Sequence, residues 1–352
     1  MNEDADIEDL PSTVPANMLI ELMGAPDNEE ELATKIGEAV AYITRHCGRY
    51  MDLSLLERIT VGWNYDEALQ AVDLGYESST AKTYTDTENL RGIAKTIRVR
   101  RGEAIKAHTI FNANQLSCLK DQKEPDYFSA VNLVAHELGH ACLITWFETH
   151  SPGRYSEPFR GDWLRGLLMD SAHTCWEEYA ACRLASVFPH PIVKEEYLKR
   201  AVMHSSEAFA KAHEFIKAYR IHGDLHRTIF EVCRVIFEAI RLLSYYLGYM
   251  EGPNSGSTSL AESEKFGDLT PFVKGLQREM QNAWNTALEW DGLNDLNGLL
   301  SEILNILSAA GMEVTLDNAE YEQFSRVHFP FSPQTLPGGE DTYRLMKKQN
   351  LL

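Results

Sequence analysis

The chain has 352 residues, of which 44% are hydrophobic and 24% charged, and its formal net charge is −19 at pH 7. This composition is that of a globular protein with a large core, and it excludes a fibrous, wholly disordered or membrane-embedded chain. The excess of acidic residues argues against general nucleic-acid binding, because contact with phosphates needs clustered Lys and Arg side chains.

The N-terminus, from Met1 to Val14, is acidic and lacks the basic start and apolar run of a secretory signal. The most apolar helix-like stretch, from Val235 to Met250, is interrupted by Glu238 and Arg241, which does not suit a membrane span of about 20 apolar residues. The six cysteines include no C-x-x-C pair and are expected to be reduced. We therefore expect a cytoplasmic protein that does not associate with a membrane.

The N-terminal half is expected to begin with a tail and continue into a helix and a small sheet. Residues 1–18 are polar and acidic and predict a flexible acidic tail. Apolar residues at helical spacing from Glu29 to Tyr50 predict an amphipathic helix that ends near Gly48. Short β-type runs follow at Ile59 to Trp63, Ile93 to Arg100 and Ile105 to Ala113. Because Gly102 separates the last two runs as a hairpin turn would, the pattern predicts a mostly antiparallel sheet.

Helical periodicity dominates from Asp126 almost to the end of the chain. The amphipathic segments of the second half run from Glu195 to Tyr219, Leu225 to Met250, Phe272 to Trp290 and Leu296 to Leu307. The expected fold class is therefore α+β, with a core over residues 19–190 and a predominantly helical C-terminal domain over residues 191–352.

The segment that carries chemistry is His136-Glu137-Leu138-Gly139-His140. Histidines at i and i+4 project from one face of a helix, so both imidazoles can bind one Zn²⁺, and the glutamate lies at the edge of that face. Asp126 is expected to cap this helix, and Ser151-Pro152-Gly153 to end it. The alternative is a helix with two incidental histidines. It is disfavoured because burying such polar groups beside an apolar stripe costs free energy.

A catalytic zinc site also needs a third protein ligand and an open position. The extended pattern H-E-x-x-H-x-x-G-x-x-H would require Gly at position 143 and His at position 146. The chain has Leu143 and Trp146 there, which excludes that class. A carboxylate on a later helix is the next candidate, and Glu177 and Glu178 both supply one.

Over about residues 105–187 the chain resembles the gluzincin metallopeptidases, the thermolysin-like branch of the H-E-x-x-H zincins. In that branch a later helix carries a pattern like E-x-x-A-D-R-L-A, whose first Glu is the third zinc ligand. The run Glu178-Tyr-Ala-Ala-Cys-Arg-Leu-Ala matches it in register. The resemblance therefore implies a zinc site of His136, His140 and Glu178, with Glu177 left open as the alternative ligand.

The stretch from Ile110 to Leu116, just before the motif, also looks like the ImmA/IrrE-type peptidases, in which an edge strand leads into the active-site helix. These resemblances imply a zincin-like core, in which a small sheet packs with the active-site helix. A strand over Ile105 to Ala113 would pair with an extended peptide substrate if it formed the sheet edge. Ordinary internal pairing of that strand is equally compatible with the sequence.

The chain departs from the gluzincin pattern at one position, where Cys182 replaces the Asp that orients a zinc-bound imidazole. Loss of that partner is expected to lower metal affinity by roughly tens of fold unless another acceptor replaces it. Cys175, Glu178 and Cys182 share one face of the predicted helix, so either thiolate has the spacing to approach the metal. Packing as small apolar residues is the favoured role for both cysteines.

The expected function is zinc-dependent hydrolysis of peptide bonds, in which Glu137 deprotonates a metal-activated water. The expected partners are a protein or peptide substrate, with room for a regulatory protein. One rival is a zincin-like module that has lost catalysis and acts as a scaffold or sensor in a larger assembly. The intact Glu137 weighs against it, because a structural metal site needs no general base. The other rival is hydrolysis of a non-peptide amide or ester.

Overall fold

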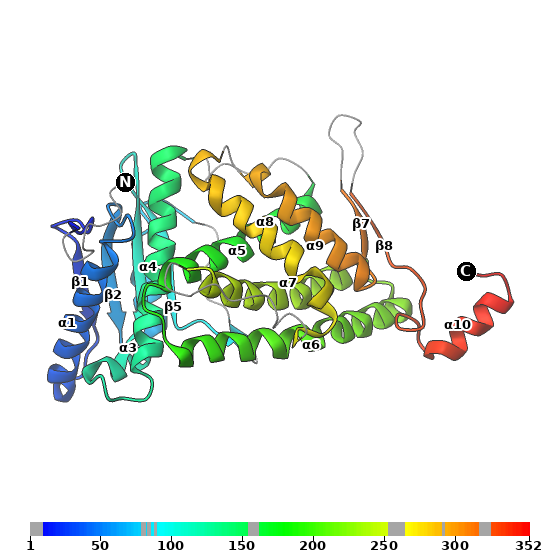
Figure 1. Cartoon of the computed structure of the whole chain (residues 1–352), viewed down its shortest axis with the longest axis horizontal. Coiled ribbons are helices and arrows are strands. Elements are labelled where there is room, and N and C mark those ends of the chain that lie inside the picture. Colours follow the sequence, from blue (N-terminus) through cyan, green and yellow to red (C-terminus); the bar gives the residue numbers. More distant parts are fainter. Residues whose placement is uncertain are drawn as a thin grey trace. The chain divides into compact units, whose positions relative to one another are not determined.

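The structure is a computed structural model, and it describes residues 10–78, 82, 86–87, 90–153, 162–252, 265–290, 293–316 and 325–352 (Figure 1). Contacts between α-carbons divide the chain into two compact units. Unit 1 comprises residues 1–155, 180–194 and 248–256, and unit 2 comprises residues 156–179, 195–247 and 257–352. The predicted domain boundary at residue 190 stays a prediction, and the first nine residues of the predicted tail lie outside the described residues.

Unit 1 is built on a four-stranded sheet with the strand order β1-β2-β6-β5. Its strands are β1 (Leu19–Met23), β2 (Leu56–Gly62), β5 (Ala94–Arg101) and β6 (Ala104–Asn112). The pairs β1–β2 and β2–β6 are parallel, and β5–β6 is antiparallel. The predicted hairpin at Gly102 is confirmed, with φ +64° at that glycine. The α+β class holds, but the prediction of a mostly antiparallel sheet is wrong, because the sheet is mixed.

The parallel pairs arise from the crossover between β1 and β2. Helix α1 (Glu30–Cys47) follows the five-residue strand β1 and returns the chain to the start of β2, which makes the two strands parallel. Helix α1 ends before Gly48, as predicted. Strand β6 lies between β2 and β5, so the idea that Ile105 to Ala113 forms the sheet edge is wrong. The edge strand beside β6 is β5.

One face of the sheet is covered by two helices, α1 and α4 (Tyr127–His150), which share a single apolar core with β2 and β6. The other face is partly covered by α2 (Tyr65–Ala71), whose apolar residues pack on Val99 and Ile110. The remaining short elements of unit 1 are β3 (Asp86–Thr87), β4 (Leu90–Arg91) and α3 (Ala113–Leu116). The two-helix face is therefore the one that carries the H-E-x-x-H helix.

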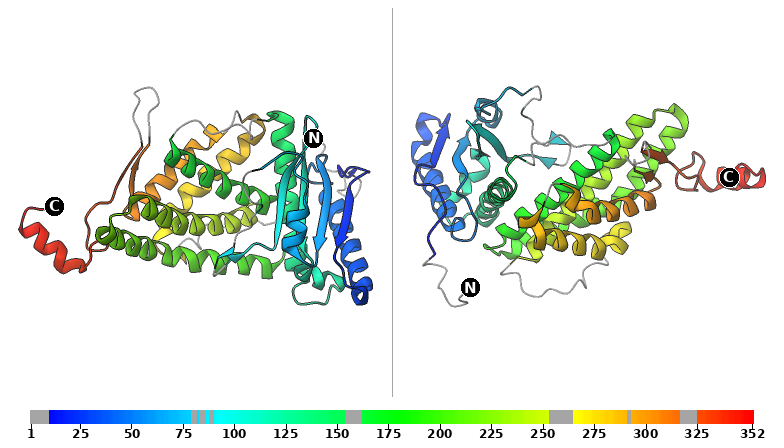
Figure 2. Two further views of the ribbon diagram at one scale, coloured as in Figure 1. Left: turned by 180° about the vertical axis from the view of Figure 1, so that it is seen from behind. Right: turned by 90° about the horizontal axis from the view of Figure 1, so that it is seen from above.

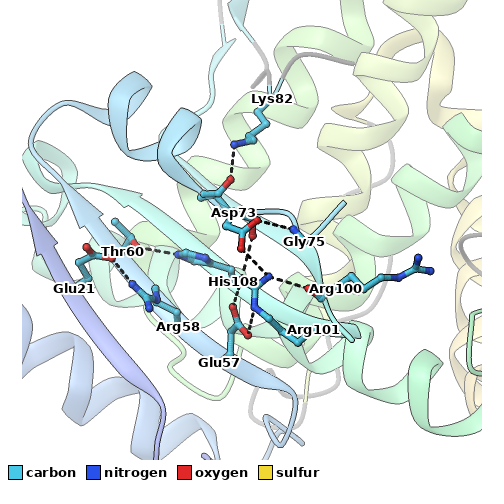
Figure 3. Close-up of polar contacts among 11 residues, drawn as sticks. Glu21, Glu57, Arg58, Thr60, Asp73, Gly75, Lys82, Arg100, Arg101 and His108 are labelled. Carbon is cyan, nitrogen blue, oxygen red and sulfur yellow. Dashed lines mark hydrogen bonds and ion pairs between the residues drawn. The ribbon is translucent and has the colours of Figure 1, made fainter. Parts of the chain in front are cut away.

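The opposite face carries a polar cluster, which Figure 3 shows at the strands β1, β2 and β6. Thr60 Oγ1 lies 2.9 Å from Nε2 of the buried His108, and Arg58 pairs with Glu21 at 2.8 Å. Burial, together with the charge of Arg58, lowers the pKa of His108 to about 4. His108 is therefore a neutral imidazole at pH 7, and its contacts are with the sheet itself.

Part of the predicted tail is tied to unit 1. The backbone N–H of Thr13 donates to the Gly48 carbonyl at 2.8 Å, and the Thr13 hydroxyl donates to the Met51 carbonyl at 2.7 Å. In return, the Leu53 N–H donates to the Thr13 hydroxyl at 2.9 Å. These bonds fix the chain ahead of β1 against the C-terminal end of α1.

Unit 2 is helical, as Figure 2 shows in two views. Its main elements are the first part of α5 (Trp163–Ala185), α6 (Pro191–His222), α7 (Leu225–Met250), α8 (Val273–Thr286) and α9 (Asn297–Ala309). These helices confirm the amphipathic segments predicted for the second half. Trp176 packs on Trp290 with ring centroids 4.3 Å apart, and His204 of α6 lies 3.4 Å from Glu238 of α7.

Unit 2 also contains elements that the sequence pattern did not predict. A short hairpin pairs β7 (Glu313–Thr315) with β8 (Arg326–His328), and helix α10 (Gly339–Lys348) follows. Helix α10 has ten residues, none of which is buried. Among the described residues, no helix has the length and apolar character needed to cross a membrane.

Candidate metal centre

Helix α4 carries both histidines of the motif and lies against the sheet. It begins after Asp126 and ends before Ser151, as predicted, although the Asp126 side chain makes no capping hydrogen bond. Its buried residues include Val134, Leu138, His136 and Glu137. His136 is only 8% exposed and Glu137 only 7%. Burial of an imidazole and a carboxylate at this level is costly unless each has a bonding partner, so their surroundings are informative.

The two histidines bring their ring nitrogens together. Nε2 of His136 lies 3.2 Å from Nε2 of His140, and the two rings are almost perpendicular, at 88°. Two nitrogens bound tetrahedrally to one Zn²⁺ at about 2.0 to 2.1 Å would be about 3.3 Å apart. The pair therefore fits a shared zinc ion without a change in its separation.

Glu178 completes a group of three metal-binding side chains. One ligand atom from each of His136, His140 and Glu178 lies within 4.8 Å of the other two. Glu178 stands on α5, two residues before the part of that helix that belongs to unit 1. Two imidazoles and one carboxylate are the protein ligands of one known class of catalytic zinc site. The donor set therefore fits a catalytic metal ion.

The alternative ligand Glu177 is not part of this group in the described residues. Its Oε1 lies 3.8 Å from Nε2 of His173, one turn earlier on α5. Consecutive residues on a helix point about 100° apart, so only one of the two glutamates can face α4. The structure brings Glu178, and not Glu177, to the histidines.

The approach of α5 to α4 depends on Gly139, within the motif. A Cβ atom placed on Gly139 would lie 2.9 Å from both the Cα and the carbonyl oxygen of Ala181. In real proteins a Cβ atom essentially never lies this close to a backbone atom. The two helices therefore pack backbone to backbone at this point, three residues beyond Glu178 on α5.

Cys182 occupies the position expected for the partner of a zinc-binding imidazole. Its Sγ lies 3.4 Å from Nδ1 of His136, and the thiol is fully buried. If His136 binds a metal through Nε2, its Nδ1 carries the proton and donates it to the sulfur. Sulfur is a weak acceptor, so this contact orients the ring less firmly than a carboxylate would.

Replacing Cys182 with Asp is expected to increase zinc affinity about tenfold, because outer partners of metal-binding histidines are worth about 10- to 100-fold. Cys182→Ala, which removes the acceptor, is expected to bind zinc more weakly than wild type. Competition with a chromogenic chelator measures both affinities. If the Asp variant binds no more tightly than the Ala variant, Nδ1 of His136 does not depend on residue 182.

Cys175, the second cysteine on that face of the predicted helix, does not join the metal group among the described residues. Its Sγ lies 3.9 Å from the carbonyl oxygen of Phe237. Burial raises the pKa of the Cys175 thiol to about 12, and a protonated thiol is a poor metal ligand. The structure therefore gives Cys175 the packing role that the sequence favoured.

The side chain of Glu137 is held by a strand of the sheet. The Thr96 hydroxyl, on the edge strand β5, lies 2.8 Å from Glu137 Oε2 and 2.9 Å from the Glu137 carbonyl oxygen. Lys95, the preceding residue, is also close. Burial lowers the pKa of Lys95, and the Glu137 carboxylate opposes that shift. No sequence motif marks Thr96, because its contact with Glu137 spans 41 residues.

Comparisons of the chain with protein families, with curated proteins and with solved structures found no match.

Proposed function

We propose that this chain is a zinc-dependent peptidase with a zincin-like core. The observation that carries the proposal is the meeting of His136, His140 and Glu178 within 4.8 Å, with the buried Glu137 next to His136. A site that only held a metal for structural reasons would have no use for a buried carboxylate beside its ligands. The proposal therefore rests on four residues and on their mutual placement.

His136 and His140 would bind Zn²⁺ through Nε2, and Glu178 through one carboxylate oxygen. Zinc in such a site polarises the scissile carbonyl and lowers the pKa of water to about 7. Glu137 Oε2 already accepts a hydrogen bond from Thr96, which leaves Oε1 to take the proton of the attacking water. The same carboxyl group then delivers that proton to the amine that leaves.

The substrate we propose is a protein or an extended peptide. Strand β5 is the sheet edge on the side of α4, and it has one strand neighbour among the described residues. An extended peptide can add to such an edge through backbone hydrogen bonds. We therefore propose for β5 the pairing with substrate that the sequence suggested for Ile105 to Ala113.

We also propose that the protein works in the cytoplasm. All six cysteines are free thiols in the structure, which suits a reducing compartment. The proposal includes a regulatory protein partner, because a cytosolic peptidase without restraint would be harmful.

The test is to remove the metal from the purified protein and then to add zinc back. Purified protein is expected to hold about one zinc ion per chain, and to cleave a broad peptide mixture followed by mass spectrometry. A strong chelator should abolish cleavage, and added Zn²⁺ should restore it. Zinc binding without any cleavage of peptides would contradict the proposal and favour the scaffold or sensor. Cleavage of esters or non-peptide amides alone would favour the second rival.

A further inference from the structure

Two threonines connect the interior of the sheet to Glu137. The β5–β6 register places Thr96 directly opposite Thr109, and their hydroxyl oxygens lie 3.1 Å apart. Thr109 is fully buried. Thr96 in turn reaches two oxygens of Glu137, the carboxylate Oε2 and the backbone carbonyl. A continuous line of hydrogen bonds therefore runs from Thr109 through Thr96 to Glu137.

The direction of these bonds follows from counting protons. A threonine hydroxyl has one proton to donate, whereas an ionised carboxylate and a carbonyl oxygen can only accept. The Thr96 hydroxyl is therefore the donor to both Glu137 oxygens, the carboxylate Oε2 and the backbone carbonyl. Thr96 has no second proton for Thr109, so Thr109 donates to Thr96. The bond from Thr96 to Glu137 is the end of a polarised chain, which strengthens it.

This arrangement restricts the torsions of the Glu137 side chain. A glutamate has three side-chain torsions, and fixing it costs conformational entropy. Thr96 holds the carboxylate of Glu137 and also the backbone of the same residue, so one hydroxyl sets the position of the carboxylate relative to helix α4. A general base is effective only within hydrogen-bond reach of the proton that it takes.

We propose that Thr96 is a positioning residue for Glu137, and that this is the function of a hydroxyl at position 96 of the edge strand. The inference rests on the proposed function, since it gives Glu137 the role of general base. The Thr96 hydroxyl itself touches neither metal nor substrate. Val at this position has the same shape and lacks the proton, whereas Ser keeps the proton.

The test compares Thr96→Val with Thr96→Ser on a peptide that the zinc-loaded wild type cleaves. Thr96→Val is expected to lower kcat by about 10- to 100-fold, because a misplacement of about 1 Å in a catalytic group can cost about 100-fold. KM and zinc affinity should stay near their wild-type values, and Thr96→Ser should keep most of the activity. In a Glu137→Gln background, Thr96→Val should cause little further loss.

Thr60→Val is the matched control, because Thr60 is a threonine of the same sheet, but its hydroxyl contacts His108 on the opposite face. It should lower thermal stability like Thr96→Val and leave kcat unchanged. An equal loss of kcat in both variants, or an additive loss in the Glu137→Gln background, would overturn the positioning role.

A crystal structure of metal-free Thr96→Val separates this inference from the proposed function. The Glu137 carboxylate is expected to leave its wild-type position in that variant, whether or not the wild type cleaves peptides. A carboxylate that stays in place without the Thr96 hydroxyl would refute the positioning role. If the carboxylate moves but the wild type shows no cleavage, the proposed peptidase function is at fault.

Discussion

Zinc-loaded protein with Glu137 replaced by Gln is expected to cleave peptides about 10²- to 10⁴-fold more slowly than wild type, which is the usual contribution of a general acid–base group. Gln has nearly the same shape, and its amide oxygen can still accept the hydrogen bond from Thr96. It cannot take a proton near neutral pH. Since the three metal ligands are untouched, zinc affinity should remain that of the wild type. The measurements are kcat/KM on a fluorogenic peptide and zinc affinity by chelator competition.

Glu148→Gln supplies the matched control for this experiment. Glu148 lies on the same helix, and its carboxylate accepts a hydrogen bond from the Gly153 N–H at 3.1 Å, away from the histidines. Its replacement should leave kcat/KM unchanged. If Glu137→Gln retains wild-type activity, Glu137 is not the base. If the same variant loses zinc instead, Glu137 holds the metal rather than the proton.

The second large effect is expected at the third ligand. Glu178→Ala removes the only carboxylate among the three side chains that converge in the described part of the chain. Zinc affinity should fall by more than about 100-fold, the upper end of what the loss of an outer partner costs. Peptide cleavage should fall with the bound zinc. Chelator competition measures the first quantity, and activity at saturating zinc measures the second.

Glu177→Ala is the natural control, because it makes the same change one residue earlier on α5. Its carboxylate lies near His173, so its loss should leave zinc affinity close to the wild-type value. The thermal unfolding of both metal-free variants shows whether either change disturbs the helix itself. Should Glu177→Ala lose zinc while Glu178→Ala keeps it, the register of the third ligand is shifted by one residue.

Local patterns predicted the elements whose boundaries depend on local chemistry. Helix α7 begins and ends at the predicted residues Leu225 and Met250, and α1 stops before Gly48. The hairpin at Gly102 was readable because a positive φ favours glycine. Strand direction was not readable, because it depends on β1. This strand has only five residues, and the charged Glu21 interrupts its apolar pattern.

The residues of the candidate site also differ in whether the sequence could predict them. The placement of His136 and His140 followed from helical spacing alone, and Glu178 followed from the register of a resembling motif. The partners of the site are distant in sequence: Thr96 lies 41 residues before Glu137, and Cys182 lies 46 residues after His136. Such contacts depend on how α4 meets the sheet and α5, and a single sequence contains no direct record of that packing.

The close approach at Gly139 changes how the metal motif of this chain should be described. The pattern H-E-x-x-H treats position 139 as open to any residue, but here the backbone of Ala181 occupies the space where a side chain would begin. A larger residue at position 139 would push apart the helices that carry the histidines and Glu178. For this chain, the site therefore also requires a glycine within the motif, so its histidines and glutamates alone do not define it.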